Sequence, residues 1–319
     1  MVSPKKPIAV FYEHPDWFRP LFAQFEQRGT SFVRVQPGEH FFDIGTPDGG
    51  FSLLFNRMSP SAWTRGHARS IFYTLNYVAA LERAGVRVVN GARAFTSEIS
   101  KSLQLALMRQ LGLPYPRTRV IHDASAAPAA AQGLRFPVVV KPNIGGSGAG
   151  VHRFDTPAAL AEAAQKDQLD FGLDHTALVQ EFIPARGGYI TRVEVLGGKY
   201  LYAIEVYFSG ESFNLCPGDI CSTTGGVELA RAICPADAPR NNMKVAVTHP
   251  PAKVIAAVER IMHAAGIEVG GVEFIVDDRD GQPYYYDVNA LSNFVADGER
   301  VLGFNPYARL AEFLEREAC

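Results

Sequence analysis

The chain has 319 residues, of which 47% are hydrophobic and 20% charged, and its formal net charge is −2. Such a composition is ordinary for a globular protein and gives ample material for buried cores in two or three domains. The near-neutral charge offers no electrostatic basis for nucleic acid or an anionic membrane as the main partner. No apolar run approaches the roughly 18 residues that span a bilayer.

The first 95 residues alternate between predicted strands and predicted helices. Strands are expected at PIAVFY, TSFVRV, FSLLFN and VRVVN, and helices over 19–29 and 66–84. This alternation predicts an α/β domain with an open, mostly parallel sheet over residues 1–95. The N-terminal apolar run is too short for a signal peptide. No GxGxxG follows the first strand, so a dinucleotide site is not indicated.

A second unit is expected over residues 96–184. Ser97 can cap a helix that carries Glu98 in its first turn, with an apolar stripe of Ile99, Leu103, Leu107 and Leu111. The runs FPVVVKP and ALVQEFIP predict strands. Between the strands, the Ala-rich segments 122–133 and 156–166 predict helices, which makes the unit α+β.

A third unit is expected over residues 185–319, beginning with a hairpin that turns at LGGK. Helices are predicted over 250–266 and 305–317. The segment 209–250 is rich in Gly, Pro, Asn and Cys and is expected to be irregular. It contains Cys216, Cys221 and Cys234, whose spacing does not fit a zinc ribbon. Small buried or loop thiols in a reducing cytoplasm are the simpler interpretation.

The stretch KPNIGGSGAGV, residues 141–151, places glycines directly after a predicted strand. Glycines let backbone N–H groups approach and cup phosphate oxygens, and Lys141 supplies a positive charge. The loop residues concerned are Gly145, Gly146, Ser147, Gly148 and Gly150. The lysine precedes the glycines, so the loop is not a Walker A motif, and taken alone it could equally be a plain turn.

Acidic residues on the hairpin VEFIVDDRDGQPYYYDVN point to a cation. Alternation places Tyr285, Asp287 and Asn289 on one face, and pairing Asp277 with Pro283 would set Glu273 opposite Asp287. Like charges across a ladder repel, whereas Mg²⁺ binds carboxylate and amide oxygens together with nucleotide phosphates. The alternative is a solvated acidic face. Together with the glycine loop, the hairpin predicts a nucleoside triphosphate site.

These motifs, in this order, resemble the ATP-grasp superfamily, and most of all its RimK-like carboxylate–amine ligases, from about residue 90 to 319. The resemblance implies an ATP-grasp fold, in which a Rossmann-like N-terminal domain precedes two α+β subdomains that clamp ATP. It makes Lys101 and Lys141 phosphate-binding lysines and 145–150 a lid. It also implies adenine contacts by Gln180, Glu181, Phe182 and Ile183 in LVQEFIP, and metal ligation by Glu273, Asp287 and Asn289.

The chain departs from the family pattern at several positions. Glu273 and Asp287 exchange the usual Asp and Glu, and Ile190-Thr191-Arg192 stands where Asp-Ile-Arg is expected. ALSNF follows Asn289 in place of Ser-Pro-Gly. Simpler readings also exist: Lys101 as a solvated helix lysine, and Arg192 in a weak ion pair with Glu194 or Glu205.

The resemblance implies an ADP-forming ligase that makes an amide or peptide bond through an acyl phosphate, with ATP and one or two Mg²⁺. Arg192 and Asn214, the latter in FNLCPGD, would hold the reacting groups, and Arg57 and Arg65 are tentative contacts of the carboxylate substrate. Small-molecule or peptide substrates, no nucleic acid, no membrane and a homodimer are expected. The alternatives are a small-molecule kinase and a non-catalytic ATP-binding regulatory module.

Overall fold

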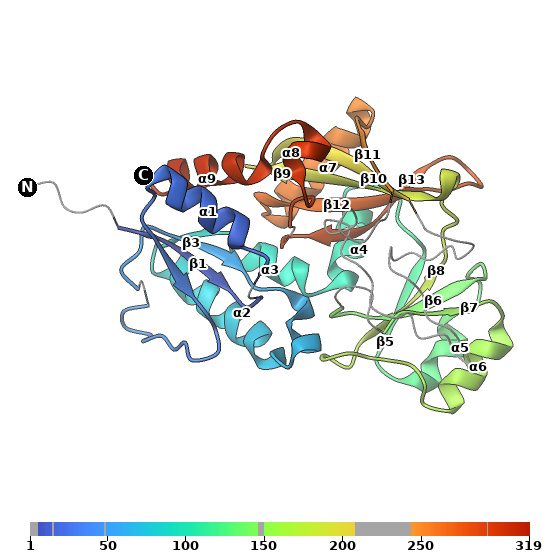
Figure 1. Cartoon of the computed structure of the whole chain (residues 1–319). Coiled ribbons are helices and arrows are strands. Elements are labelled where there is room, and N and C mark those ends of the chain that lie inside the picture. The colour runs from blue at the N-terminus through green and yellow to red at the C-terminus, as the bar shows by residue number, and fades with distance from the viewer. Residues whose placement is uncertain (1–5, 15, 48, 146–149, 208–243, 292) are drawn as a thin grey trace, which may run out of the picture.

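Three β-sheets, joined and covered by helices, make up the protein in the computed structural model (Figure 1). The structure describes residues 6–14, 16–47, 49–145, 150–207, 244–291 and 293–319. The mixed α/β class expected from the sequence is confirmed. No helix in these ranges combines the length and apolar character needed to cross a bilayer.

The N-terminal sheet is parallel and has the strand order β2-β1-β3-β4, as the alternating pattern predicted. Its strands are β1 (Ile8–Tyr12), β2 (Phe32–Val35), β3 (Leu53–Arg57) and β4 (Arg87–Val89). Helices α1 (Arg19–Arg28) and α2 (Ala68–Arg83) connect them. Every residue of β1 and β3 is buried, which is typical of strands covered on both faces.

The predicted helix at Ser97 is in fact two helices, α3 (Ala92–Glu98) and α4 (Lys101–Gln110). Ser97 belongs to the last turn of α3, and the cap of α4 is Ser100, whose side chain accepts from the backbone N–H of Leu103 at 3.3 Å. The expected stripe is wrong at Leu103, which is 50% exposed while Gln104 is buried, although Leu107 and Leu111 do pack against an apolar cluster. The polar Gln104 faces inward because it binds the backbone of Val288, in a strand of the third sheet. Helix α4 begins at Lys101, directly after its cap.

The central sheet is antiparallel with the order β5-β8-β6-β7. Its strands are β5 (Thr118–Ile121), β6 (Val138–Pro142), β7 (His152–Phe154) and β8 (Ala177–Glu181). Helices α5 (Ala127–Ala130) and α6 (Pro157–Gln165) lie over one face (Figure 1). An apolar cluster that includes Leu160 fills the space between these helices and the sheet.

The third sheet has five antiparallel strands in the order β11-β10-β9-β12-β13. They are β9 (Tyr189–Leu196), β10 (Lys199–Tyr207), β11 (Val245–Thr248), β12 (Val269–Val276) and β13 (Pro283–Asn289). Part of the segment expected to be irregular is thus a strand, β11, while 208–243, with its three cysteines, lies outside the described residues. Helix α7 (Ala252–Ala265) packs on this sheet.

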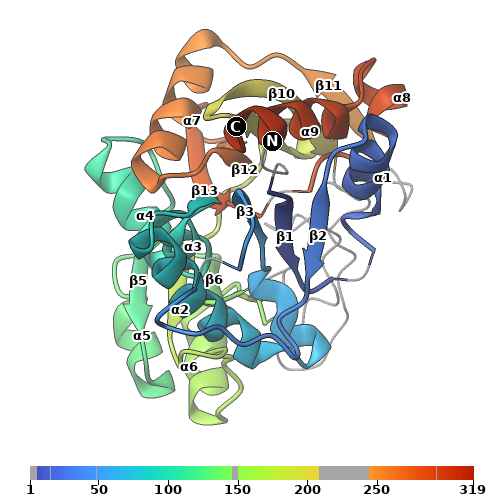
Figure 2. The same ribbon diagram turned by 90° about the vertical axis from the view of Figure 1, so that its left-hand side faces the viewer.

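One apolar cluster spans the N-terminal sheet and the five-stranded sheet. Val10 of β1 and Ile275 of β12 belong to it together with Leu314 of the last helix, α9 (Pro306–Glu317). Helix α9 follows the short α8 (Gly298–Leu302) and lies beside α1, with Arg28 paired to Glu315 at 2.8 Å (Figure 2). The first and last elements of the described chain therefore share one core.

Candidate functional site

The acidic hairpin β12–β13 places Glu273 directly opposite Asp287, as predicted. The reasoning that led there was partly wrong, because Val276, not Asp277, pairs with Pro283. A β-bulge next to Glu273 adds one residue to β13 and restores the expected pairing. The bulge also sends Tyr285 into the apolar cluster under α7, away from the face of Asp287. Tyr286 instead donates a hydrogen bond from its hydroxyl to Glu273 at 2.8 Å.

Asp287 lies between a lysine and an amide. Lys101, at the start of α4, forms a short ion pair with one carboxylate oxygen, and the Asn289 side chain donates to the other at 3.2 Å. Burial would raise the pKa of Asp287, but the charges of Lys101 and Lys141 and the Asn289 hydrogen bond outweigh it, and the pKa is lowered. Asp287 is therefore ionised at neutral pH.

Glu273 has a different environment. Burial and the nearby charge of Asp287 raise its pKa, and Arg192 opposes that rise. The Arg192 guanidinium donates to Glu273 at 2.7 Å and to Glu194 at 2.6 Å, and all three side chains are almost fully buried. The ion pair with Glu194 that was considered for Arg192 is thus present, but it is buried and shared with Glu273. Removing one partner would leave an uncompensated buried charge, which typically costs about 3–5 kcal/mol.

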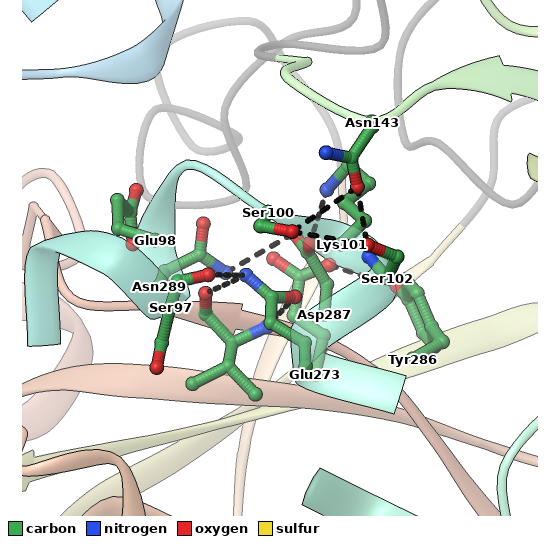
Figure 3. A network of polar contacts seen from close by, with 12 residues as sticks. Ser97, Glu98, Ser100, Lys101, Ser102, Asn143, Glu273, Tyr286, Asp287 and Asn289 are labelled. Carbon is green, nitrogen blue, oxygen red and sulfur yellow. Dashed lines mark hydrogen bonds and ion pairs between the residues drawn. The ribbon is translucent and has the colours of Figure 1, made fainter. Parts of the chain in front are cut away.

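Lys141 lies near the end of β6, close enough for its charge to act on Asp287, and Asn143 fastens this strand to α4. The Asn143 side-chain oxygen accepts from the Ser102 N–H at 2.9 Å and from the Ser100 hydroxyl at 3.3 Å, and its main-chain oxygen accepts from the Lys101 N–H at 3.3 Å. Figure 3 shows Ser100, Lys101 and Ser102 gathered around Asn143. Two elements distant in sequence thereby bring both predicted phosphate lysines to one place.

The glycine loop is described only at its two ends. A Cβ placed on Gly145 would lie 3.4 Å from the Cε of Lys101, so the chain passes close over that lysine. Gly150 has a φ of +72°, a conformation that favours glycine. Gly146, Ser147 and Gly148, like Asn214, lie outside the described residues.

The residues predicted to hold adenine lie at the end of β8. Gln180 is buried, and its amide donates to the Thr118 hydroxyl at 2.9 Å, whereas its side-chain oxygen accepts no hydrogen bond within the described structure. Glu181 is held by the Arg135 N–H at 2.9 Å. Phe182 lies under the Arg153 guanidinium, 4.6 Å from the ring centre, and Ile183 is buried.

The two tentative substrate arginines have separate surroundings. Arg57 is buried at the end of β3, stacks on the rings of Phe55 and Phe18, and lies 3.4 Å from the main-chain oxygen of Ala290, just after β13. Burial lowers its pKa to about 10, so it stays charged at neutral pH. Arg65 forms a two-pronged ion pair with Glu13, after β1. The structure thus brings Arg57, but not Arg65, into contact with the segment that follows the acidic hairpin.

A cavity of about 1110 Å³ opens beside the segment that follows β13. Residues 293–300 line one wall, and the start of α1 with Trp17 lines another. Arg65 lies over the Trp17 ring, 5.2 Å from its centre. The cavity therefore lies between the N-terminal sheet region and the chain that leaves the acidic hairpin.

Several buried residues with polar groups were not assigned to the site by the sequence analysis: Asn90, Glu98, Gln104, Asn143 and Tyr286. Glu98 accepts a short hydrogen bond from the Ala290 N–H, and burial raises its pKa to about 7. The available signal was weak, because Gln104 is one of several polar residues in α4 and nothing distinguished Asn143 from an ordinary loop residue.

The donor set fits Mg²⁺ and a nucleotide. Two carboxylates and an amide, on Glu273, Asp287 and Asn289, supply the hard oxygens that Mg²⁺ prefers, with the rest of its shell left to water and phosphate. In the described ranges no three His, Cys, Asp or Glu side chains converge as a metal cage by themselves. The unsatisfied Gln180 oxygen is suited to a hydrogen-bond donor such as an exocyclic amine.

Comparison with known proteins also points to an ATP-binding domain. Residues 96–219 match the family model of the RimK-like ATP-grasp domain. A D-alanine–D-alanine ligase from Anaeromyxobacter dehalogenans (strain 2CP-C) is 30% identical over 210 residues, which is 65% of this chain and 61% of that protein. The chain therefore matches less than two thirds of this relative's length.

Two solved structures share the fold over nearly the whole chain. One is the ATP-grasp ligase PsnB complexed with a minimal precursor, with a TM-score of 0.68, 17% identity, and coverage of 98% of this chain and 99% of PsnB. The other is a RimK-domain ATP-grasp protein from Sphaerobacter thermophilus DSM 20745, with a TM-score of 0.68, 22% identity, and coverage of 96% and 98%. At this identity the likeness establishes the fold alone.

Proposed function

We propose that this chain, whose residues 96–219 match the RimK-like ATP-grasp domain, is an ATP-dependent carboxylate–amine ligase that releases ADP. One observation supports this above all: Lys101 and Lys141 converge on Asp287, which faces Glu273 across β12–β13. Cations for phosphate and oxygen ligands for a metal thus meet at one point, which is the requirement of phosphoryl transfer.

In this proposal each group has a defined task. Lys101 and Lys141 neutralise phosphate charge, and Glu273, Asp287 and Asn289 hold Mg²⁺, which when bound stabilises the charge of the triphosphate. Adenine lies against the end of β8, at residues 180–183. No nucleophilic side chain is needed, because the substrate carboxylate itself takes the phosphoryl group and an amine then displaces phosphate.

Arg192 is the proposed electrostatic partner of the transferring phosphoryl group. Its guanidinium is oriented by Glu194 on its own strand, which leaves its other edge toward Glu273 and the metal ligands. A preoriented cation in a buried site stabilises developing negative charge more strongly than one in water. Asn214, outside the described residues, keeps its proposed role beside the tetrahedral oxyanion.

The substrates are proposed to be amino acids or peptides. The similar proteins named above include a D-alanine–D-alanine ligase and PsnB, a ligase that was also solved with a precursor peptide. The cavity beside residues 293–300 is large enough for either, and the buried charge of Arg57 suits a carboxylate on the side of the N-terminal sheet.

The test is a screen of amino acids, dicarboxylates and short peptides in pairs, with ADP release as the readout and hydroxylamine added to trap an acyl phosphate. We expect ADP release that requires both a carboxylate and an amine, and a hydroxamate when hydroxylamine replaces the amine. Lys141→Ala should abolish both. Turnover with a hydroxyl acceptor and no hydroxamate would show a kinase instead, and nucleotide binding without any turnover would show a regulatory module.

A further inference from the structure

The strand that carries Asp287 and Asn289 lies at the edge of its sheet. β13 pairs with β12 on one side, and no further strand follows on the other within the described residues. Alternate residues of such a strand point their backbone N–H and C=O groups away from the sheet, and those groups need partners when they are buried. In the C-terminal part of β13 and just after it, the residues concerned are Val288 and Ala290, while nearer the start of the strand the Tyr285 N–H donates to the main-chain oxygen of Pro114 at 3.0 Å.

Side chains take the place of the missing strand. The Gln104 side chain accepts from the Val288 N–H at 3.0 Å and donates to the Val288 carbonyl at 2.9 Å. At Ala290, Glu98 accepts from the N–H, and the Asn90 amide donates to the carbonyl at 2.6 Å. One segment, running from residue 90 through α3 and α4, therefore supplies the hydrogen-bond partners of Val288 and Ala290 at this edge.

Gln104 has a special place in this arrangement. It lies three residues after Lys101 and thus on the same side of α4, while Val288 directly follows Asp287. Gln104 also donates to the Ser97 carbonyl at 3.0 Å, which joins α4 to the end of α3. The Gln104–Val288 pair and the Lys101–Asp287 pair are consecutive contacts of one helix with one strand, so the first fixes the register of the second.

We propose that Gln104 is a positioning residue that holds the lysine and the metal-binding carboxylate in register by binding both backbone groups of Val288. This inference rests on the proposed function for its catalytic meaning. The inference goes beyond the proposed function because it assigns a task to a residue that would touch neither nucleotide nor metal. A helix and a strand that could slide by one residue would separate the phosphate-binding charge from the metal site.

The test compares wild type with Gln104→Met, which keeps the volume but loses the paired hydrogen bonds. The matched control is Leu105→Ala, a buried neighbour on the same helix. Calorimetry measures ADP affinity with and without Mg²⁺. We expect the gain in affinity on adding Mg²⁺ to fall about tenfold in Gln104→Met and to stay at the wild-type value in Leu105→Ala, although both variants lower stability.

A third variant separates hydrogen bonding from mere packing. Gln104→Glu can accept from Val288 but can donate only when protonated, and a buried carboxyl has a raised pKa. Its deficit relative to wild type should therefore shrink between pH 8 and pH 6, whereas that of Gln104→Met should not. A pH-independent deficit in both variants would overturn the proposed hydrogen-bonding role.

Hydrogen exchange of the ligand-free protein distinguishes the positioning role of Gln104 from the proposed ligase function. The amide of Val288 should exchange much faster in Gln104→Met than in wild type or Leu105→Ala. Wild type that binds no ADP would contradict the proposed function, and the exchange result would still decide whether Gln104 holds β13. Normal wild-type binding, with an unchanged Mg²⁺ effect in Gln104→Met, would overturn the positioning role alone.

Discussion

Asp287 lies between a lysine and a second carboxylate, because it pairs with Lys101 and faces Glu273. Replacing it with Asn keeps the shape and removes the charge. We expect Asp287→Asn to lower substrate-dependent ADP release at least about a hundredfold, since it removes preorganised charge from the transition state. Affinity for metal-free ADP should not fall, because Lys101 is released to bind phosphate.

The matched control for this variant is Asp278→Asn, on the exposed turn of the same hairpin. It should retain full activity. Wild-type activity and wild-type Mg²⁺ dependence in Asp287→Asn would exclude this carboxylate as a metal ligand.

Glu98 makes stability depend on pH. Its pKa is raised from 4.5 to about 7 in the folded protein, so between these values the native state holds a proton that the unfolded chain has lost. Stability must then fall as pH rises through this window, by at most about 3 kcal/mol from this group. We expect Glu98→Gln to lose less stability than wild type between pH 5 and pH 7.5, as measured by urea unfolding. Parallel pH profiles would show that Glu98 titrates normally.

At the scale of elements, the close contact of β12 with β13 depends on a glycine. A Cβ on Gly270 would overlap the main-chain oxygen of Asn289 and lie 2.9 Å from the Cγ2 of Ile267. Gly270→Ala should therefore lower the free energy of unfolding by about 2–3 kcal/mol, because β13 must move. Gly38→Ala, which meets nothing within 4 Å, should stay within about 0.5 kcal/mol of wild type. Equal denaturation midpoints for the two variants would contradict this account.

An element could be predicted from the sequence where its cause lies in neighbouring residues, and could not where it depends on contacts with distant ones. The strands of the parallel sheet and the β9–β10 hairpin follow from apolar runs and glycine turns, which the sequence displays directly. The bulge beside Glu273 does not, because it depends on how Tyr285 and Tyr286 divide between two faces of the sheet. The burial of Gln104 in α4 was likewise missed, because its partner lies in a strand about 180 residues away.

The same distinction applies to the site. Lys101, Lys141, Glu273, Asp287 and Asn289 could be selected because motif order along the chain identifies them, and the structure brings them together. Their supporting residues, such as Asn143, could not be selected, because an amide that binds backbone groups carries no pattern in a single sequence.

At the scale of the whole molecule, the shared core predicts which regions unfold together. Leu314 of α9 is fully buried in the cluster that joins β1 to β12, whereas Leu160 of α6 belongs to the separate cluster of the central sheet. Leu314→Ala should cost about 2–5 kcal/mol and expose β1 and β12 to hydrogen exchange together. Leu160→Ala should cost a similar amount but raise exchange first in β5–β8. Indistinguishable exchange patterns would show that all three sheets form a single cooperative unit.

The start of α4 is fastened to two sheets at once, through Asn143 to β6 and through Gln104 to β13. If the central sheet rotates relative to the five-stranded sheet, this point is the natural pivot, and atoms near a pivot move least. The far ends of the two sheets could then move apart for an incoming substrate while Lys101, near the pivot, stays almost still. Release of product and retention of the nucleotide tail would thus become mechanically independent events.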